Sequence, residues 1–193
     1  MTDGYSLRER LGAGAMGEVF AATDSAGMKC ALKFLRSELT ANPRAAERFN
    51  REIAASVTLN HPNLLKVFGY GFARDGRLYL STELLQGRTL KEELKKNDRA
   101  PELALDVVEE VGAALAYLQE RGVVHRDVKL ENIFVRENGG LVLMDLGIAQ
   151  TANTESLTVA GQAMGSPLYM APEQVQGKPG PATDQYALGL VLY

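Results

Sequence analysis

Short apolar runs broken by turn-forming residues fill the first third of the chain and predict β-strands. A glycine-rich turn separates the first two runs, and the dipeptide Asp75-Gly76 separates the last two. Glycine, serine and aspartate are typical of hairpin turns, because they tolerate the backbone angles that a chain reversal requires. We therefore expect antiparallel strands at residues 8–13, 18–23, 28–35, 64–72 and 77–84.

One helix is predicted between the third and fourth strands. Phe49, Ile53 and Val57 recur at every fourth position, which places them on one face of a helix. Asn42 suits the N-cap and Pro43 the first helical position, because proline lacks the N–H group that would be unpaired there.

The pattern becomes helical in the second half of the chain. Apolar residues recur with helical spacing from Pro101 onward, and Gly122 suits a left-handed helix end. We expect this helix to be largely buried, through a stripe of Leu103, Val107, Val111, Ala114, Leu115 and Leu118 that is widened by Ala104, Val108 and Ala113.

A second hairpin and a long loop follow that helix. Residues 133–135 and 141–144 flank Asn138-Gly139-Gly140, a strong hairpin turn signal. Residues 148–165 are polar and hydroxyl-rich without useful periodicity, which predicts a mobile loop of the kind that is usually functional or disordered. Together the patterns predict an α+β fold of two lobes, a β-rich N-lobe at residues 1–85 and a helical C-lobe at residues 86–193.

Composition excludes several classes of partner. The 193 residues are 46% hydrophobic and 23% charged, with a net charge of −3, which gives no electrostatic reason to expect nucleic acid or an anionic membrane. Cys30 is the only cysteine, so we expect no disulfide framework and a cytoplasmic, reducing location. No apolar run approaches the roughly 20 residues of a membrane helix, although a membrane anchor outside this segment stays open.

The chain stops within an apolar segment, residues 186–193. Burying one aliphatic side chain stabilises a protein by about 1.5–3 kcal/mol, and total native stability is only about 5–15 kcal/mol. We therefore expect the C-lobe to be incomplete, and the polypeptide as written to be unstable or to aggregate.

The glycine-rich turn is the first candidate for chemistry. Gly12, Gly14 and Gly17 would let backbone N–H groups approach phosphates without obstruction by a β-carbon. A dinucleotide-binding turn would need a helix directly afterwards, and Glu18 onward predicts a strand instead. A glycine hairpin without a ligand remains the alternative for this motif alone.

Lys33 lies on an otherwise apolar strand, where its charge needs a phosphate or a carboxylate partner. Glu52, at the edge of the apolar stripe of the predicted helix, is the natural carboxylate. The alternative is a strand lysine that reaches water and an unrelated surface glutamate.

The segment from His125 to Gly147 carries the strongest chemical signal. Asp127 can receive or orient a hydroxyl proton, and Lys129 can neutralise charge on a transferring phosphate. Asn132 and Asp145 offer the hard oxygen ligands that Mg²⁺ prefers. This spacing from Asp to Asn suits phosphoryl transfer from Mg-ATP. We expect His125 to have a structural role rather than to act as a base.

These motifs resemble those of the eukaryotic-type (Hanks-type) serine/threonine protein kinases, bacterial members above all, over residues 11–193. The resemblance implies a bilobal kinase fold, the use of ATP and Mg²⁺, and protein substrates with Ser/Thr hydroxyls. Lys129, placed two residues after Asp127, is the serine/threonine-kinase form rather than the tyrosine-kinase form.

The resemblance also assigns the site. Lys33 would hold the α- and β-phosphates and pair with Glu52, and Asp127 would be the catalytic base or orienting carboxylate, with Lys129 beside it. Asn132 and Asp145 would bind magnesium. The other ATP-binding positions, in the glycine-rich loop, adenine pocket, gatekeeper and hinge, would be Leu11, Gly12, Gly14, Gly17, Val19, Ala31, Thr82, Glu83, Leu85 and Phe134.

Two further segments match the kinase pattern. Residues 165–173 resemble the substrate-docking loop and its Ala-Pro-Glu anchor, which disfavours a kinase acting on small molecules. Asp184 resembles the aspartate that begins the central C-lobe helix and ties down the His125-Arg126 backbone.

Arg126 directly precedes Asp127, an arrangement that is linked with activation by loop phosphorylation. Thr158 is the expected phosphosite. A Ser/Thr-rich loop without regulation is the alternative. Autophosphorylation can take place in trans, between the two molecules of a kinase dimer. The rival hypothesis for the whole chain is a truncated, catalytically impaired fragment that binds nucleotide or a partner.

Overall fold

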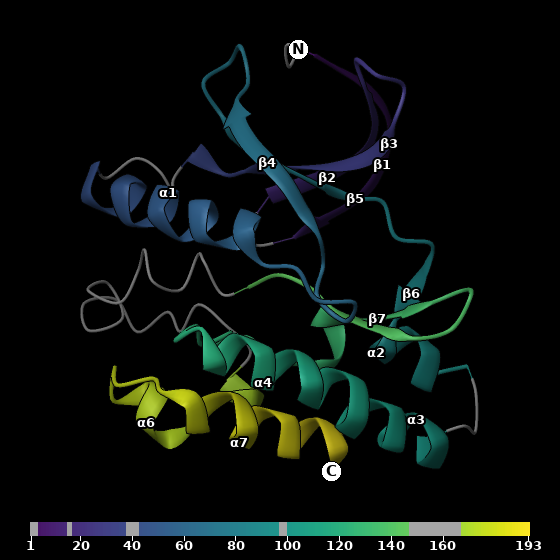
Figure 1. Ribbon diagram of the computed structural model, residues 1–193, viewed down its shortest axis with the longest axis vertical. Helices are drawn as coiled ribbons and strands as arrows, with labels where there is room; N and C mark the ends of the chain where they lie inside the picture. Colours follow the sequence, from purple (N-terminus) through teal and green to yellow (C-terminus); the bar gives the residue numbers. More distant parts are fainter. Residues whose placement is uncertain (1–3, 15–16, 38–42, 97–99, 147–166) are drawn as a thin grey trace. The chain divides into compact units, whose positions relative to one another are not determined.

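The computed structural model describes residues 4–14, 17–37, 43–96, 100–146 and 167–193, which form two compact units. The first unit comprises residues 1–59 and 66–84, and the second comprises residues 60–65 and 85–193 (Figure 1). The lobe boundary expected at residues 85/86 stays a prediction.

The first unit is built on a five-stranded antiparallel sheet in the order β1-β2-β3-β5-β4. The strands are β1 Tyr5–Gly14, β2 Gly17–Asp24, β3 Lys29–Leu35, β4 Val67–Phe72 and β5 Leu78–Glu83. Each overlaps the range that the sequence predicts. The fourth begins at Val67 rather than at residue 64, because Leu64 and Leu65 belong to the second unit and pair there with Leu143.

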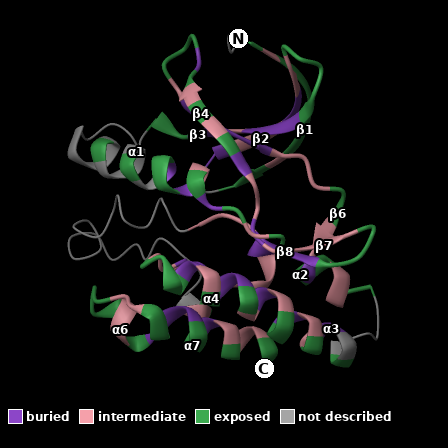
Figure 2. Cartoon of the chain, in the orientation of Figure 1, coloured by how far each residue is buried: buried purple, intermediate pink, exposed green. Residues whose placement is uncertain are grey.

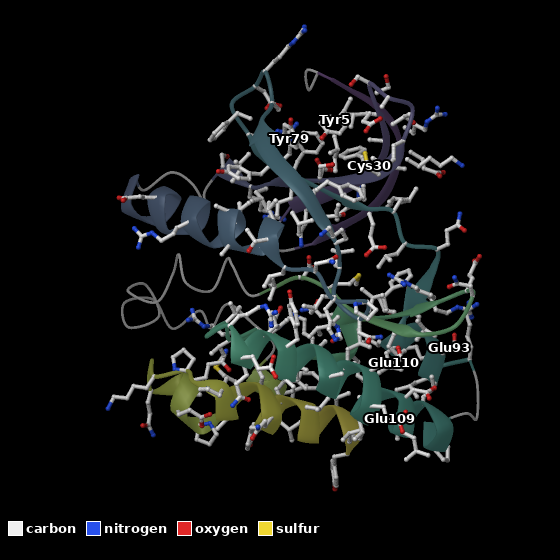
Figure 3. The ribbon with its side chains drawn as sticks, viewed as in Figure 1. Tyr5, Cys30, Tyr79, Glu93, Glu109 and Glu110 are labelled. Atoms are coloured by element: carbon white, nitrogen blue, oxygen red, sulfur yellow. The ribbon has the colours of Figure 1, made fainter. Side chains whose placement is uncertain are left out.

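One face of this sheet carries an aromatic core. Tyr5 meets Tyr79 edge-on with ring centroids 5.7 Å apart, and Phe34 lies against both Phe20 and Tyr79. Cys30 is buried in the same cluster as a free thiol, and Figure 3 shows it with Tyr5 and Tyr79. Because side chains alternate along a strand, the opposite face is left for other residues.

Helix α1, Pro43–Thr58, packs against β4 and begins at the predicted proline. Ile53 of the expected stripe is fully buried and Val57 is half-buried, whereas the side chain of Phe49 lies outside the described residues. Ser56 is buried as well, and its hydroxyl donates to the Ile53 carbonyl oxygen at 2.7 Å. That bond satisfies the hydroxyl without a partner from another element.

The second unit combines helices with a small sheet. Its strands, β6 Gly87–Thr89, β7 Ile133–Arg136 and β8 Leu141–Leu143, form an antiparallel sheet in that order. Its helices are α2 Leu90–Leu94, α3 Ala100–Asp106, the π-helical turn Val107–Val111, α4 Gly112–Glu120, α6 Pro172–Val175 and α7 Pro181–Leu192, with short 3₁₀ turns at Leu130–Asn132 and Pro167–Tyr169. Among the described residues, no helix is long and apolar enough to cross a membrane.

The long helical segment from residue 100 to residue 120 buries the predicted stripe. All six stripe residues are buried, and buried and exposed positions alternate along α4 (Figure 2). Gly122 has a φ of 68° and ends the helix as predicted. The expected widening is wrong at Val108, which is 51% exposed, and at Ala113, which is also exposed, whereas Ala104 is half-buried. The π-helical turn Val107–Val111, a wider turn than that of an α-helix, was not indicated by the sequence.

Candidate active site

Asp127 is the centre of a group of polar side chains in the second unit. Its carboxylate is buried and accepts two hydrogen bonds from the Lys129 ammonium, at 2.8 and 3.0 Å. The Asn132 amide nitrogen donates to the Asp127 carboxylate and to its carbonyl oxygen, both at 2.8 Å. Three of the residues predicted for catalysis and metal binding therefore lie within direct contact of one another.

His125 holds this loop rather than facing a substrate. Its ring is fully buried, Nδ1 accepts from the Asp127 backbone N–H at 3.3 Å, and Nε2 lies 2.9 Å from the Met144 carbonyl oxygen. Nδ1 is an acceptor, so the network assigns the proton to Nε2. Burial lowers the pKa of His125, against the opposing effect of the Asp184 and Asp127 carboxylates. The expected structural role of this histidine is confirmed.

Asp184 ties down the backbone that precedes Asp127. Its two carboxylate oxygens accept hydrogen bonds from the N–H groups of His125 and Arg126, both at 2.7 Å. Arg126 has a φ of 68°, a left-handed conformation that costs energy outside glycine and has to be held by surrounding contacts. The role that the sequence predicted for Asp184, in the first turn of α7, is confirmed.

Asp145 follows β8 and also has a left-handed backbone, with a φ of 54°. The preceding residue, Met144, donates its N–H to the Asn132 carbonyl oxygen at 2.7 Å. Asn132, which directly precedes β7, and Met144, which directly follows β8, are therefore joined by a backbone hydrogen bond. The hairpin brings the two predicted metal ligands, Asn132 and Asp145, to the same end of the β7–β8 sheet.

The first unit gathers a separate set of predicted residues on one face of its sheet. Val19 pairs directly with Lys33, and Ala31 pairs directly with Thr82. Ala31 and Lys33 are two residues apart on β3, so all four side chains share a face. This is the face opposite the aromatic core of Phe34 and its neighbours.

The glycine-rich turn contains one position that only glycine can occupy. Gly17 has a φ of 148°, and a β-carbon there would lie 1.8 Å from the Phe34 carbonyl oxygen. Gly12 pairs with Val19 across the β1–β2 hairpin, and Leu11 and Gly14 lie on the same strand, β1. A β-carbon added at Gly12 or at Gly14 would meet no described atom within 4 Å, which leaves open space beside the backbone.

The predicted adenine-binding residues are divided between the units. Thr82 and Glu83 end β5, and the Glu83 carboxylate accepts the Lys66 backbone N–H at 2.9 Å. Leu85 and Phe134 belong to the second unit, where Phe134 pairs with Thr89 of β6 and Val142 of β8.

Several predicted residues lie outside the described part of the chain. They are Asn42, the Glu52 side chain, Gly147, the predicted loop at residues 148–165 with Thr158, and residues 165–166 of the segment that resembles a docking loop. The Lys33–Glu52 ion pair and the phosphosite therefore stay predictions. That the two groups of residues, one in each unit, act on the same nucleotide also stays a prediction.

Two contacts of this region were not predicted. The Gln174 side-chain amide donates to the Arg126 carbonyl oxygen at 2.8 Å, and the Thr183 hydroxyl donates to Glu173 at 2.9 Å. Gln174 follows the Ala-Pro-Glu segment directly, and Thr183 precedes Asp184 directly, so their positions beside matched motifs were the only available signal.

The sequence pattern that describes the protein kinase domain matches residues 5–193. The chain belongs to the protein kinase family. The serine/threonine-protein kinase PknA of Mycobacterium tuberculosis is 39% identical over 196 residues, which cover 98% of this chain and 46% of PknA. The serine/threonine-protein kinase PrkC of Bacillus subtilis is 34% identical over 194 residues, covering 98% of this chain and 30% of PrkC.

The crystal structure of a double mutant of the Mycobacterium tuberculosis PknI kinase domain has a TM-score of 0.82 to this chain. The two are 29% identical, and the match covers 100% of this chain and 75% of that chain. The predicted family and the α+β kinase fold are confirmed. This kinase chain spans less than half the length of PknA and of PrkC.

Members of this family use ATP and a divalent metal, and the described residues fit such a metal. The Asn132 amide nitrogen is committed to Asp127, so the amide oxygen is the atom with which Asn132 can bind a cation. That oxygen and the Asp145 carboxylate are donors of the kind that hard cations such as Mg²⁺ select.

Proposed function

We propose that the protein transfers the γ-phosphate of ATP to serine and threonine hydroxyls of protein substrates. The observation that carries this proposal is the contact of Asp127 with both Lys129 and Asn132 at the end of the β7–β8 hairpin. Membership of the protein kinase family and the serine/threonine kinases among the relatives support it.

Asp127 is the group that we assign to the substrate hydroxyl. A buried carboxylate fixed by an ammonium and an amide can orient a hydroxyl and accept its proton. The Lys129 ammonium already lies at hydrogen-bond distance from the Asp127 carboxylate. It would place positive charge beside the transferring phosphate. Most of the rate enhancement would come from positioning and electrostatic stabilisation, as is usual for phosphoryl transfer.

Asn132 and Asp145 are the residues that we assign to Mg²⁺. When bound, the ion would neutralise charge on the phosphates of ATP. Lys33, which shares a sheet face with Val19, Ala31 and Thr82, would hold the α- and β-phosphates, with Glu52 as its partner. The glycine-rich turn would cover the phosphates with backbone N–H groups.

The same proposal includes regulation by autophosphorylation at Thr158, in trans within a kinase dimer. Among the described residues, the buried Arg126 Nε has no hydrogen-bond partner. An arginine nitrogen kept from water in this way is suited to a phosphate, because charge-assisted bonds to phosphate are strong. The single buried, unpaired cysteine, Cys30, supports a reducing cytoplasmic location.

Transfer of radiolabelled phosphate from ATP to the full-length protein and to a generic protein substrate tests the proposal. We expect incorporation at serine and threonine that disappears in Asp145→Ala. Thr158→Ala should remove most autophosphorylation, as mapped by mass spectrometry. Binding of ATP without any transfer would instead support the alternative, a nucleotide- or partner-binding module.

A further inference from the structure

Glu110, in the π-helical turn Val107–Val111, joins three segments of the second unit. Its Oε2 atom accepts a hydrogen bond from the Asn63 side-chain amide and another from the Leu141 backbone N–H, each at 2.6 Å. The Asn63 amide also donates to the Leu141 carbonyl oxygen at 2.9 Å. Figure 3 shows Glu110 on the side of the helix that faces the β7–β8 hairpin. One carboxylate oxygen thus holds the start of β8.

The two hydrogen bonds that Glu110 accepts anchor a short parallel pairing between residues 63–65 and β8. The Leu143 N–H donates to the Asn63 carbonyl oxygen at 2.8 Å, and the Leu65 N–H donates to the Leu143 carbonyl oxygen at 3.0 Å. Strand β8 is therefore paired with β7 on one side and with residues 63–65 on the other. Glu110 binds both segments, at Asn63 and at Leu141, where this second pairing begins.

Strand β8 leads directly to the predicted metal ligand Asp145. At its far end, Met144 donates to the Asn132 carbonyl oxygen and its own carbonyl lies 2.9 Å from His125 Nε2. The strand is held at both ends, by Glu110 at its start and by Asn132 and His125 after its last residue. A shift of β8 would therefore displace Asp145 relative to Asn132.

The geometry points to Glu110 as a positioning residue for phosphoryl transfer, acting through β8 to place the Asp145 carboxylate at the metal. This inference rests on the proposed function, because it takes Asp145 as a metal ligand. Hydrogen bonds to an ionised carboxylate are stronger than those between neutral groups, so Glu110 is well suited to fix a strand. Groups that orient a metal ligand without touching the metal typically change metal affinity or activity by about 10–100-fold when they are replaced.

The test compares three variants of the full-length protein. Glu110→Ala removes both bonds, and Glu110→Gln keeps an acceptor oxygen while it removes the charge. Glu109→Ala makes the same change of charge at the neighbouring, exposed position and serves as the matched control. The readouts are the Mg²⁺ concentration for half-maximal transfer, the affinity for Mn²⁺ with a non-hydrolysable ATP analogue, and hydrogen exchange of the peptide covering residues 141–146.

We expect Glu110→Ala to raise the half-saturating Mg²⁺ concentration and to weaken Mn²⁺-analogue binding about 10-fold. Exchange in residues 141–146 should become faster in that variant. Glu110→Gln should recover part of the loss, because it keeps an acceptor oxygen but not the charge, and Glu109→Ala should match the wild type. A loss of folded protein alone would lower the maximal rate without changing the metal concentration required.

An unchanged metal requirement and unchanged analogue binding in Glu110→Ala would overturn the inference, even if the maximal rate fell. Equal effects of Glu110→Ala and Glu109→Ala would overturn it too. If the wild type binds the metal nucleotide but transfers no phosphate, the proposed function fails, and the binding and exchange readouts still decide the role of Glu110. A wild type that binds no metal nucleotide would contradict both.

Discussion

Lys129 places its ammonium nitrogen 2.8 and 3.0 Å from the two carboxylate oxygens of Asp127. Both side chains are largely removed from water, with exposed side-chain fractions of 16% and 6%. Removing one partner of such a buried pair leaves an uncompensated charge and typically costs about 3–5 kcal/mol of stability. The pair therefore fixes the loop that contains Asp127 and Lys129 as well as the charge within it.

Asp127→Asn separates these two roles. The amide has nearly the same shape and keeps one acceptor oxygen for Lys129, so it costs less stability than a truncation would, but it is a far weaker proton acceptor. We expect turnover to fall by about 10²–10⁴, the usual contribution of a positioned base. Radiolabelled γ-phosphate transfer at saturating ATP measures it. Undiminished transfer by the variant would contradict the role assigned to Asp127.

Asp184→Ala should destabilise the second unit. The change leaves the N–H groups of His125 and Arg126 without their acceptor, and hydrogen bonds to a charged group are worth about 1.5–3 kcal/mol each. Thermal unfolding should show the loss, with Asp184→Asn intermediate because it keeps one acceptor oxygen. Gln185→Ala, at the next and exposed position of α7, should have little effect. Equal melting temperatures for Asp184→Ala and Gln185→Ala would rule out this account.

Gly17→Ala should disturb the β1–β2 hairpin far more than Gly14→Ala. A β-carbon at Gly17 would lie 1.8 Å from the Phe34 carbonyl oxygen at a backbone angle of φ 148°, whereas one at Gly14 meets nothing within 4 Å. Strained backbone of this kind costs about 1–3 kcal/mol before the collision is counted. Denaturant unfolding of both variants measures the difference. Similar stabilities would show that the hairpin does not need glycine at position 17.

Stability should fall as the solution becomes acidic, through His125. Burial lowers the pKa of this histidine below its usual 6.5, so the folded protein keeps the ring neutral while the unfolded chain takes up a proton. Its contribution is therefore complete above pH 6.5 and is lost as the pH falls below that value. His125→Gln should be less stable overall, but with a smaller dependence of melting temperature on pH between about 5 and 7. An unchanged pH dependence would show that other groups cause it.

Local signals explain why much of the fold could be predicted. The turns at Asp75-Gly76 and Asn138-Gly139-Gly140 are set by the residues themselves, and both hairpins formed where they were expected. Likewise, Asp127, Lys129 and Asn132 are close in sequence, so their spacing alone indicated a shared site.

The missed features depend on contacts between distant segments. The π-helical turn that presents Glu110, and the pairing of residues 63–65 with β8, arise from packing that no short window of sequence contains. The Gln174 bond to Arg126 joins residues 48 positions apart. Val108 was expected to be buried from its apolar character alone, which does not show which side of the helix the rest of the fold covers.

We propose that Lys33 of the first unit and Asp127, Asn132 and Asp145 of the second act on one nucleotide. The most direct test is a crystal structure of the full-length protein with Mg²⁺ and a non-hydrolysable ATP analogue. We predict Lys33 on the α- and β-phosphates, Asn132 and Asp145 on the metal, and Asp127 facing the γ-phosphate. A nucleotide that contacts residues of only one unit, or side chains that point into different cavities, would contradict the account.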